Sequence, residues 1–571
     1  MKILNRRSTL LLNVPRALSL LVLVSGLSAQ LAEDQPRFGI PQDWTHHHIV
    51  FNRRVLLDHP ELARIEPRVL HQFLRETRPS SVSGTSVSAG QSPSATDSGV
   101  KRDWFVSLGG GTLAFGMSPA KFGFNPDPAI TPVSCANDYV VYGLDVVGVT
   151  GGQGNLVAFN NLYSGAVING VNPLCGGAPS LMFSYNTSTV AGGKIATSPV
   201  LSLSGKKIAF VESGTNISVF HVLTWATGPG NGAGAATSAF PGAGNTASMT
   251  SLTYALTATN SYSSPWIDYG SDVAYVGADD GKIYKITGVF KGTPTLAGAP
   301  WPIPITVNRQ LSPVVLDLAT NNLFLGDSLG VLWSVNTISP LAPGGVHQLL
   351  VGEGFAIKDG PLVDSSNGTV FAVAPSDGTS AVLVQARATN LNQLAKARIG
   401  KGSSGSPATS MDLYDGAFNN DYFNVPSSGF IFVCGTGAAD LTPWRYTFGF
   451  KTGTPPIMKT AASSSAQILP STASRCSPIS EFFNPNITTG GPTGTDFFFW
   501  GMTADCFGAD THGCVMSKVA NLNPITKVNE TGGTSAITTD NFSTAGQASS
   551  IYFSDLAPPR RGIKLTQNGL Q

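Results

Sequence analysis

Charged side chains are scarce in this sequence. Asp, Glu, Lys and Arg make up 12% of the 571 residues, about half of the roughly 25% found in average soluble domains. Lys and Arg number 35 and Asp and Glu 34, which gives a net charge of only +1. The chain therefore lacks the excess of positive charge that nucleic-acid binding requires. It also lacks the long acidic or basic runs typical of disordered tails.

Known catalytic signatures are absent as well. The sequence contains no His-Glu-x-x-His, no Walker motif and no Asp-x-Asp-x-Asp-Gly calcium loop. Helical periodicity is rare, and the longest apolar run, residues 17–27, is too short to cross a bilayer as a helix. We therefore expect no transmembrane segment in the mature chain.

The first 32 residues have the order of a secretory signal. A basic start with Lys2, Arg6 and Arg7 precedes the apolar run, and small residues follow around Ala29 and Ala32. We predict a signal peptide over residues 1–32 and a secreted or periplasmic location. The Arg pair also fits a twin-arginine signal, although we favour an ordinary basic start.

Six cysteines agree with export, because an even number of cysteines in an oxidising compartment indicates disulfides. Six cysteines allow 15 pairings. Proximity in the sequence favours Cys506 with Cys514 and Cys135 with Cys175, which leaves Cys434 with Cys476. His512 lies beside the Cys506/Cys514 pair and is a candidate metal ligand, but the spacing matches no zinc pattern.

Residues 33–77 are predicted to form a separate N-terminal extension. Pro60 and Pro67 each begin a predicted short helix, and the second helix places Val69 and Leu70 on an apolar face and Arg68 on the opposite, polar face. Residues 78–100 are rich in Ser, Gly and Pro, which is typical of a flexible linker.

From residue 101 to 571 short β-branched and aromatic runs alternate with turn residues, which predicts an all-β domain. One unit recurs: Ser-Pro, an apolar run ending in Asp, a strand of the type Val-Tyr-Val-Gly, and a Gly-containing hairpin. The prolines of these units, at 199, 265, 313, 361, 407 and 478, are spaced by 66, 48, 48, 46 and 71 residues. A period near 47 with insertions is typical of a β-propeller, with one four-stranded blade per repeat. We assign the two long insertions, residues 226–250 and 451–475, to loops.

A degenerate unit at residues 121–187 and a last unit starting at Thr534 bring the preferred count to eight blades, with seven as the alternative. The last unit supplies only three strands. Residues 104–108 are expected to supply the fourth, which closes the ring by pairing the two ends of the domain.

The repeat resembles that of quinoprotein-type (PQQ-type) β-propellers. The whole mature chain further resembles a group of exported bacterial propeller proteins of unknown function, through a Trp-Ser/Thr-His-His-His segment (Trp44–His48 here), Asp-Trp-Phe-Val-Ser-Leu at 103–108 and Ser-Ser-Ile-Tyr-Phe at 549–553. The resemblance implies a fold and a location but no activity. Quinoprotein enzymes of this type hold a calcium-bound quinone in the funnel. We cannot assign its ligands in this sequence, so no cofactor is predicted.

The polar residues of the repeats have two interpretations. Asp268, Asp317 and Asp364 occupy equivalent positions, so they either form a ring of carboxylates near the funnel or cap turns, and we favour turns. His46 and His48 share one face of an extended segment and are candidate metal ligands. We favour instead that the histidine segment docks on the propeller, with the histidines hydrogen-bonded at the contact.

Two functions are compatible with these observations. The preferred one is a non-enzymatic binding or scaffold module for an extracytoplasmic protein or polysaccharide, because large loops on a rigid ring suit recognition. The alternative is an exported enzyme with its site in the funnel, either a quinone- or metal-dependent oxidoreductase or a polysaccharide lyase or hydrolase. The polar residues that we can align are repeated from blade to blade. A set of non-repeated polar residues converging at one mouth of the ring would favour the enzyme.

Overall fold

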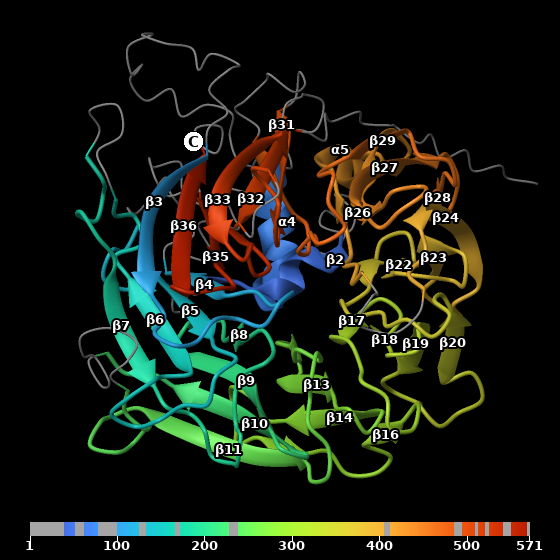
Figure 1. The fold of residues 1–571 in the computed structure, drawn as a ribbon. Coiled ribbons are helices and arrows are strands. Elements are labelled where there is room, and N and C mark those ends of the chain that lie inside the picture. Colours follow the sequence, from blue (N-terminus) through green and yellow to red (C-terminus); the bar gives the residue numbers. More distant parts are fainter. Residues whose placement is uncertain are drawn as a thin grey trace, which may run out of the picture.

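The computed structural model of the chain describes residues 39–51, 62–77, 100–124, 133–165, 172–227, 238–404, 411–484, 494–508, 512–519, 525–540 and 550–567. Within these residues the strands form eight separate sheets arranged as a ring (Figure 1). The chain is thus an eight-bladed β-propeller, which confirms the preferred prediction. The predicted signal peptide and most of the predicted linker lie outside the described residues.

The blades follow one another along the chain and are numbered in that order. Blade 1 contains β1 (Ile40–Gln42), β4 (Ala120–Gly123), β5 (Tyr139–Gly143), β6 (Leu156–Asn160) and β7 (Ser180–Tyr185), and blade 2 contains β8 (Val200–Leu201), β9 (Lys207–Gly214), β10 (Ile217–Thr224) and β11 (Ser248–Ala255). Blade 3 contains β12 (Trp266–Asp268), β13 (Val273–Gly277), β14 (Lys282–Thr287), β15 (Thr295–Leu296) and β16 (Ile303–Pro304), and blade 4 contains β17 (Val315–Asp317), β18 (Asn322–Gly326), β19 (Val331–Asn336) and β20 (Val346–Leu350).

The second half of the ring is built in the same way. Blade 5 contains β2 (Ile49–Val50), β21 (Leu362–Asp364), β22 (Thr369–Ala374), β23 (Ser380–Arg387) and β24 (Gln393–Lys401), and blade 6 contains β25 (Ala417–Phe418), β26 (Phe430–Thr436), β27 (Pro443–Lys451), β28 (Ile457–Met458) and β29 (Ser464–Gln467). Blade 7 contains β30 (Ser480–Asn484), β31 (Thr495–Met502), β32 (His512–Val519) and β33 (Thr526–Thr531), and blade 8 contains β34 (Thr538–Asp540), β35 (Ser550–Ser554), β36 (Arg561–Gln567) and β3 (Val100–Ser107). The helical elements are η1 (Trp44–His47), α3 (Leu62–Ile65), α4 (Pro67–Thr77), α5 (Asn420–Asn424) and η3 (Pro426–Ser428).

Hydrogen bonds within each blade explain why Ser-Pro and Val-Tyr-Val-Gly recur together. In blade 4 the Ser312 hydroxyl oxygen accepts the Gly326 N–H at 2.8 Å, so the start of the inner strand is fixed to the end of the second strand. A side chain at Gly326 would collide with Ile357 of the next blade, because an added Cβ would lie 2.3 Å from its Cβ. The repeated Ser and Gly therefore serve the packing of the blades.

The repeated aspartates cap turns. Asp317 accepts the Ala319 N–H at 3.1 Å and the Thr320 hydroxyl at 2.7 Å, and Asp364 accepts the Asn367 N–H at 2.9 Å. Asp268 accepts the Gly270 N–H at 3.0 Å in the same way. The turn interpretation is thus confirmed for all three.

The ring closes between the two ends of the propeller sequence. β3 pairs antiparallel with β36, with Phe105 opposite Ile563, so the N-terminal strand completes blade 8. The pairing seals the sheet edge that would otherwise be exposed. A buried ion pair supports this seam, with Lys564 Nζ 2.7 Å from Asp103 Oδ2. A second buried pair, with Lys121 Nζ 2.7 Å from Asp540 Oδ2, joins blade 1 to blade 8.

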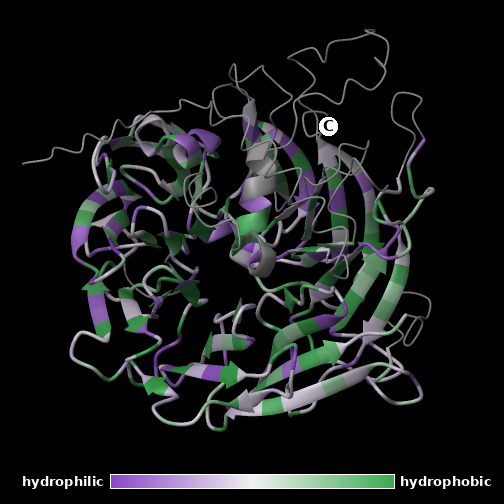
Figure 2. Ribbon diagram, turned by 180° about the vertical axis from the view of Figure 1, so that it is seen from behind, coloured by the Kyte–Doolittle hydropathy of each residue, from purple (hydrophilic) through white to green (hydrophobic). Residues whose placement is uncertain are grey.

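Apolar residues run along the strands of the blades, as Figure 2 shows, and the core lies between neighbouring blades. The largest cluster spans blades 2 to 5 and includes Trp44, Ile49, Phe51, Ala63 and Val69 of the N-terminal extension. The extension is therefore part of the propeller core rather than a separate element.

Three sequence expectations need correction. Residues 451–475 are not one loop, because they contain the short strands β28 and β29, which pair with β27. The inner strand of blade 6 is β25, which begins at Ala417, so it does not start at Ser406-Pro407, which lie outside the described residues. Arg68 does not lie on the exposed face of its helix, since it is only 1% exposed.

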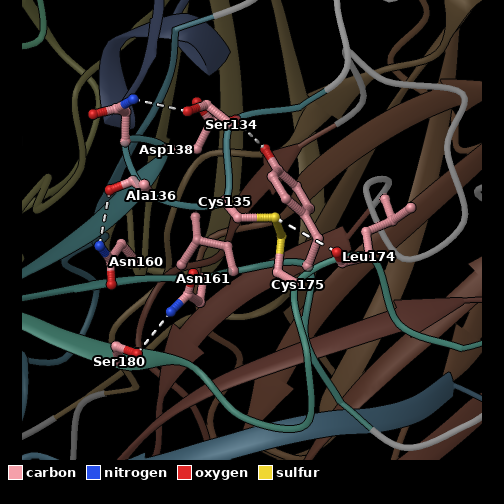
Figure 3. Close-up of a disulfide and its surroundings, with 12 residues drawn as sticks. Ser134, Cys135, Ala136, Asp138, Asn160, Asn161, Leu174, Cys175 and Ser180 are labelled. Carbon is pink, nitrogen blue, oxygen red and sulfur yellow. Dashed lines mark hydrogen bonds between the residues drawn. A yellow bond between two sulfur atoms is a disulfide. The ribbon is translucent and has the colours of Figure 1, made fainter.

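All three predicted cysteine pairings are confirmed: Cys135–Cys175, Cys434–Cys476 and Cys506–Cys514 are disulfides. Figure 3 shows the first of them, where the Asn161 side chain donates to Ser180 at 2.7 Å and Asn160 donates to the Ala136 carbonyl at 2.8 Å. Cys434 belongs to β26 of blade 6, and Cys476 immediately precedes the blade 7 repeat, so the second disulfide joins two blades.

Candidate functional site at one mouth of the axial channel

The N-terminal extension supplies two short strands that line the axis of the ring. β1 pairs antiparallel with β4, and β2 pairs parallel with β21. Since β4 and β21 are the innermost strands of their own blades, the segment from Ile40 to Val50 runs into the channel and back. In Figure 1 this segment and helix α4 lie in the middle of the ring.

A local turn joins the two strands, and we call the segment Ile40–Val50 the hairpin, although its strands pair with blades 1 and 5 and not with each other. The Asp43 carboxylate accepts the Thr45 N–H at 3.1 Å and the Thr45 hydroxyl at 2.6 Å, and the Asp43 N–H donates to His46 Nδ1 at 3.3 Å. This reciprocal arrangement is a capping box, which satisfies the free N–H groups at the start of η1. The Asp-Trp-Thr-His sequence therefore folds the tip of the hairpin by itself.

Arg68 and Gln72 of helix α4 fix the hairpin to the ring. The Arg68 guanidinium donates to the Ile267 carbonyl at 3.1 Å and to the Thr45 hydroxyl at 2.7 Å, and it pairs with Glu66 at 2.9 Å. Gln72 accepts the Phe51 N–H and donates to the Ile49 carbonyl, both at 2.7 Å. Helix α4 is thus bonded both to the hairpin and to blade 3.

A pocket remains at the end of the channel where the inner strands begin. The space that protein atoms leave free there is about 450 Å³, a figure that includes open solvent. The hairpin residues Trp44, His47 and His48 contribute to one side. The other walls are mostly the small residues that precede the inner strands, including Ser118, Ser198, Ser264, Gly416 and Ala536.

Apart from His47, which is less buried, three polar side chains of the pocket depart from the repeat: His48, Asp359 and Asp415. Each is less than a tenth exposed. His48 Nε2 lies 3.6 Å from Asp359 Oδ1. Asp359 Oδ1 accepts the Gly360 N–H at 2.9 Å, and Asp359 Oδ2 accepts the Asp415 N–H at 3.3 Å. Asp415 Oδ1 accepts the Val373 N–H at 3.1 Å.

Burial controls the protonation of this group. Burial raises the pKa of Asp359, and burial together with the neighbouring Asp359 carboxylate raises the pKa of Asp415 well above its ordinary value. Burial lowers the pKa of His48 despite the attraction of Asp359. The ring of His48 is therefore neutral near pH 7, and Asp415 resists ionisation.

The segments that line the pocket also carry a second group of polar and aromatic side chains. Lys358 Nζ lies 2.8 Å from Asp412 Oδ2 and 5.0 Å from the ring centroid of Tyr262. Arg475 shares Asp412 at 3.7 Å. Tyr414 packs edge-on against Phe115, with ring centroids 5.4 Å apart. We call this set the rim: Phe115, Tyr262, Lys358, Asp412, Tyr414 and Arg475.

The three predicted metal-ligand candidates do not lie together, because His46 and His48 are in the N-terminal extension and His512 is in blade 7. His46 and His48 both belong to the docked hairpin, but they are not on one face of an extended segment, because Trp44–His47 form the helical turn η1. His46 Nδ1 lies against Asp43, and its Nε2 has no hydrogen-bond partner in the described part of the chain. His512 is exposed at the start of β32, and its carbonyl accepts the Cys506 N–H at 3.2 Å. No group of three His, Cys, Asp or Glu residues among the described residues could hold a metal ion.

The pocket does not fit a calcium-bound quinone. Such a cofactor needs a Glu and an Asn on the metal and cationic groups against the quinone, and the described residues that line the pocket include no Glu, Asn, Lys or Arg. The hairpin also takes part of the channel for itself. We therefore assign no quinone chemistry to this pocket.

The sequence prediction did not include Asp359 and Asp415. Asp359 stands immediately before Gly360-Pro361, where blade 4 has Ser312 before its Pro, and Asp415-Gly416 precede the inner strand of blade 6. A carboxylate just before an inner strand, where the aligned copies have none, is the signal that could have revealed both. The sequence prediction rested on the residues that the repeats share, so it passed over these two residues, which occur in single copies of the repeat.

Comparisons with known proteins add no functional assignment. No protein-family model matches the chain, and no curated protein matches it significantly. One similar solved structure is the computationally designed protein Ika8, which is 12% identical, with 82% of this chain and 100% of that chain covered and a TM-score of 0.42. Another is BamB from Moraxella catarrhalis, which is 11% identical, with 74% of this chain and 96% of that chain covered and a TM-score of 0.36. A third is Sqt1 from Chaetomium thermophilum, which is 10% identical, with 82% of this chain and 98% of that chain covered and a TM-score of 0.46. These likenesses are too distant to say anything about the role of the pocket.

Proposed function

We propose that this propeller is an exported, non-enzymatic binding or scaffold module, and that it presents the pocket and its rim to an extracytoplasmic protein or polysaccharide. One observation carries the proposal. The chain's own hairpin lies along the axis of the ring, so a pocket remains at one mouth, and the segments that line it carry polar side chains. Loops held by a stiff frame are suited to recognition.

Export is supported by two features. Residues 1–32 have the order of a secretory signal, and the three disulfides are of the kind that persists outside the cytoplasm. None of the helices in the described ranges is long and apolar enough to cross a membrane. A secreted or periplasmic location is therefore part of the proposal.

The alternative, an exported enzyme, is favoured by the polar group in the pocket. His48, Asp359 and Asp415 come from three separate parts of the chain and are not repeated in the other blades. Carboxyl groups with raised pKa values beside a histidine are what acid–base chemistry uses.

Photocrosslinking in an exporting host tests the binding proposal. A photoreactive phenylalanine analogue replaces Tyr262 on the rim, and a matched control carries it at Gln393 on the exposed outer strand of blade 5. We expect a discrete adduct from position 262 and none from 393. Equal patterns from both positions, or no adduct at 262, would contradict the proposal.

Native mass spectrometry of the mature protein separates the two functions. The binding module predicts the mass of the bare chain less the six hydrogens of its three disulfides. A mass excess equal to a quinone or a metal ion would favour the exported enzyme instead.

A further inference from the structure

We propose that the pocket binds a primary ammonium group, presented by the partner of the proposed function. The inference rests on that function and names the chemistry that the pocket selects. It follows from the charges and the unused hydrogen-bonding atoms of the residues that line the pocket.

The pocket holds two carboxyl groups and no cationic side chain among its described lining residues. Asp359 is 8% exposed and Asp415 is 3% exposed, and the lining contains no Lys or Arg. The groups of the pocket that can carry positive charge are two histidines, His47 and His48, and His48 Nε2 lies 3.6 Å from Asp359 Oδ1. Two neighbouring carboxyls in a buried site repel one another unless a cation or a proton lies between them.

Unused acceptors accompany the carboxyls. In the described part of the chain Asp415 Oδ2 and His48 Nδ1 are buried and lack a hydrogen bond of ordinary geometry, while the Leu362 backbone adjoins Asp415 and the Gly360 backbone adjoins His48. If His48 Nε2 carries the proton toward Asp359, its Nδ1 is an acceptor. Buried polar atoms without a partner are rare in folded proteins and call for an explanation. An ammonium group has three donors and no acceptor, so it complements these two atoms and the carboxyl charge together.

The pocket also contains a hydrogen-bond donor without a partner, which suits a ligand that carries a polar acceptor beside its amine. Trp44 Nε1 is buried in the same pocket and has no partner in the described residues. It can donate to a carbonyl or hydroxyl of the ligand beside the ammonium. Lys358 and Arg475 of the rim share Asp412, so their positive charges are partly offset.

A divalent metal ion fits these residues less well. A metal would need at least three close side-chain ligands, and the described residues contain no such group. Hydrogen bonds to an ammonium tolerate the looser arrangement of one histidine and two carboxyls. Affinity for a single ammonium is expected to be weak, so the partner's other contacts with the rim would supply the rest.

Ligand-observed NMR line broadening tests the proposal on the mature, disulfide-bonded protein. The first probe is Nα-acetyl-lysine methylamide, and its control is the norleucine analogue, which replaces the ammonium by a methyl group. A glucosamine disaccharide is the second amine. Broadening by the lysine probe alone identifies a protein side chain as the source, and broadening by the amino sugar alone identifies a polysaccharide.

Asp415→Asn and Asp359→Asn are the pocket variants, and Asp440→Asn on an exposed loop is the matched control. We expect affinity for the amine to fall about tenfold or more in each pocket variant and to stay unchanged in Asp440→Asn. Two pocket variants are used so that one that fails to fold does not end the test.

The proposal is overturned if neither amine binds, if the norleucine analogue binds equally, or if both folded pocket variants keep wild-type affinity. Those outcomes leave the binding module intact where crosslinks from position 262 persist. Loss of the crosslinks while the amine still binds would instead overturn the binding module and leave the ammonium site standing.

Discussion

The guanidinium carbon of Arg68 lies 3.8 Å from the ring centroid of Trp266, so the N-terminal helix is stacked on the inner strand of blade 3. This contact is buried, since Arg68 is 1% and Trp266 is 2% exposed. A cation over an indole ring in a desolvated site is favourable by about 2 kcal/mol. The same guanidinium also bonds Thr45 and Ile267, so one side chain connects helix, hairpin and ring.

Replacing Arg68 with alanine is expected to release the extension. The change leaves Glu66 buried without its partner, and breaking one side of a buried ion pair costs about 3–5 kcal/mol. We expect a lower thermal midpoint and faster proteolytic cleavage within residues 39–77. Arg387→Ala, at an exposed position on β23, is the control and should leave both unchanged. Wild-type resistance to protease in Arg68→Ala would show that the hairpin is held by other contacts.

The ring seam depends on the buried pair Asp103–Lys564. Lys564→Met leaves the Asp103 carboxyl buried and unpaired, so we expect a loss of stability of about 3–5 kcal/mol. The double variant Asp103→Asn/Lys564→Met should lose less than the sum of the two single changes, since neither charge is then stranded. Denaturant unfolding of the four proteins measures this coupling. Strict additivity would mean that the pair contributes nothing to closure.

The blade pattern was predictable because its causes are local. In the repeat, Ser supplies an oxygen that accepts the Gly N–H, Asp caps a turn, and Gly allows the neighbouring blade to approach closely. These needs recur in each blade, so Ser-Pro, Asp and Gly recur with them. Strands such as Tyr139–Gly143 and Val273–Gly277 follow from β-branched and aromatic runs between turn residues. Closure of the ring followed from counting strands at the two ends.

The hairpin and the pocket depend on long-range contacts and could not be predicted in the same way. β2 has two residues and pairs with β21, which lies more than three hundred residues away. Two residues are too few to show any periodicity. The burial of Arg68 could not be predicted for a related reason. A helical wheel places Arg on the polar face, whereas in the structure Arg68 is buried between the Trp266 ring and the Glu66 carboxylate. Asp359 and Asp415 meet His48 only because the hairpin enters the channel.

The disulfide that joins two blades is expected to stabilise more than the one within a hairpin. Cys434 and Cys476 are 42 residues apart, whereas Cys506 and Cys514 are 8 apart. The loop-entropy relation gives about 4 kcal/mol for the longer loop and about 2.5 for the shorter. All four cysteines are buried, so double Cys→Ala variants of each pair are comparable. Denaturant midpoints should fall further for Cys434/Cys476. An equal or larger fall for Cys506/Cys514 would contradict the entropic account.

Asp415 should make the protein less stable at neutral pH than its asparagine variant. Burial and the nearby Asp359 carboxylate raise the pKa of Asp415 in the folded state above the value of about 3.9 in the unfolded chain. The folded protein therefore binds more protons, and the stabilisation from protonated Asp415 is complete below about pH 3.9 and is lost as the pH rises through the folded pKa. Asn has the shape of the protonated acid and loses nothing on this rise.

We therefore expect the thermal midpoint of Asp415→Asn to exceed that of the wild type near pH 7, with the difference shrinking toward about pH 4. His48 titrates in the opposite direction. Burial lowers its folded pKa, so its contribution is lost as the pH falls below about 6.5, in wild type and variant alike. The difference in thermal midpoint between wild type and Asp415→Asn therefore reports the ionisation of the Asp415 carboxyl alone. A difference that does not change with pH would mean that Asp415 ionises normally. A gain in stability together with a loss of amine binding would mark Asp415 as a residue kept for binding at the expense of stability.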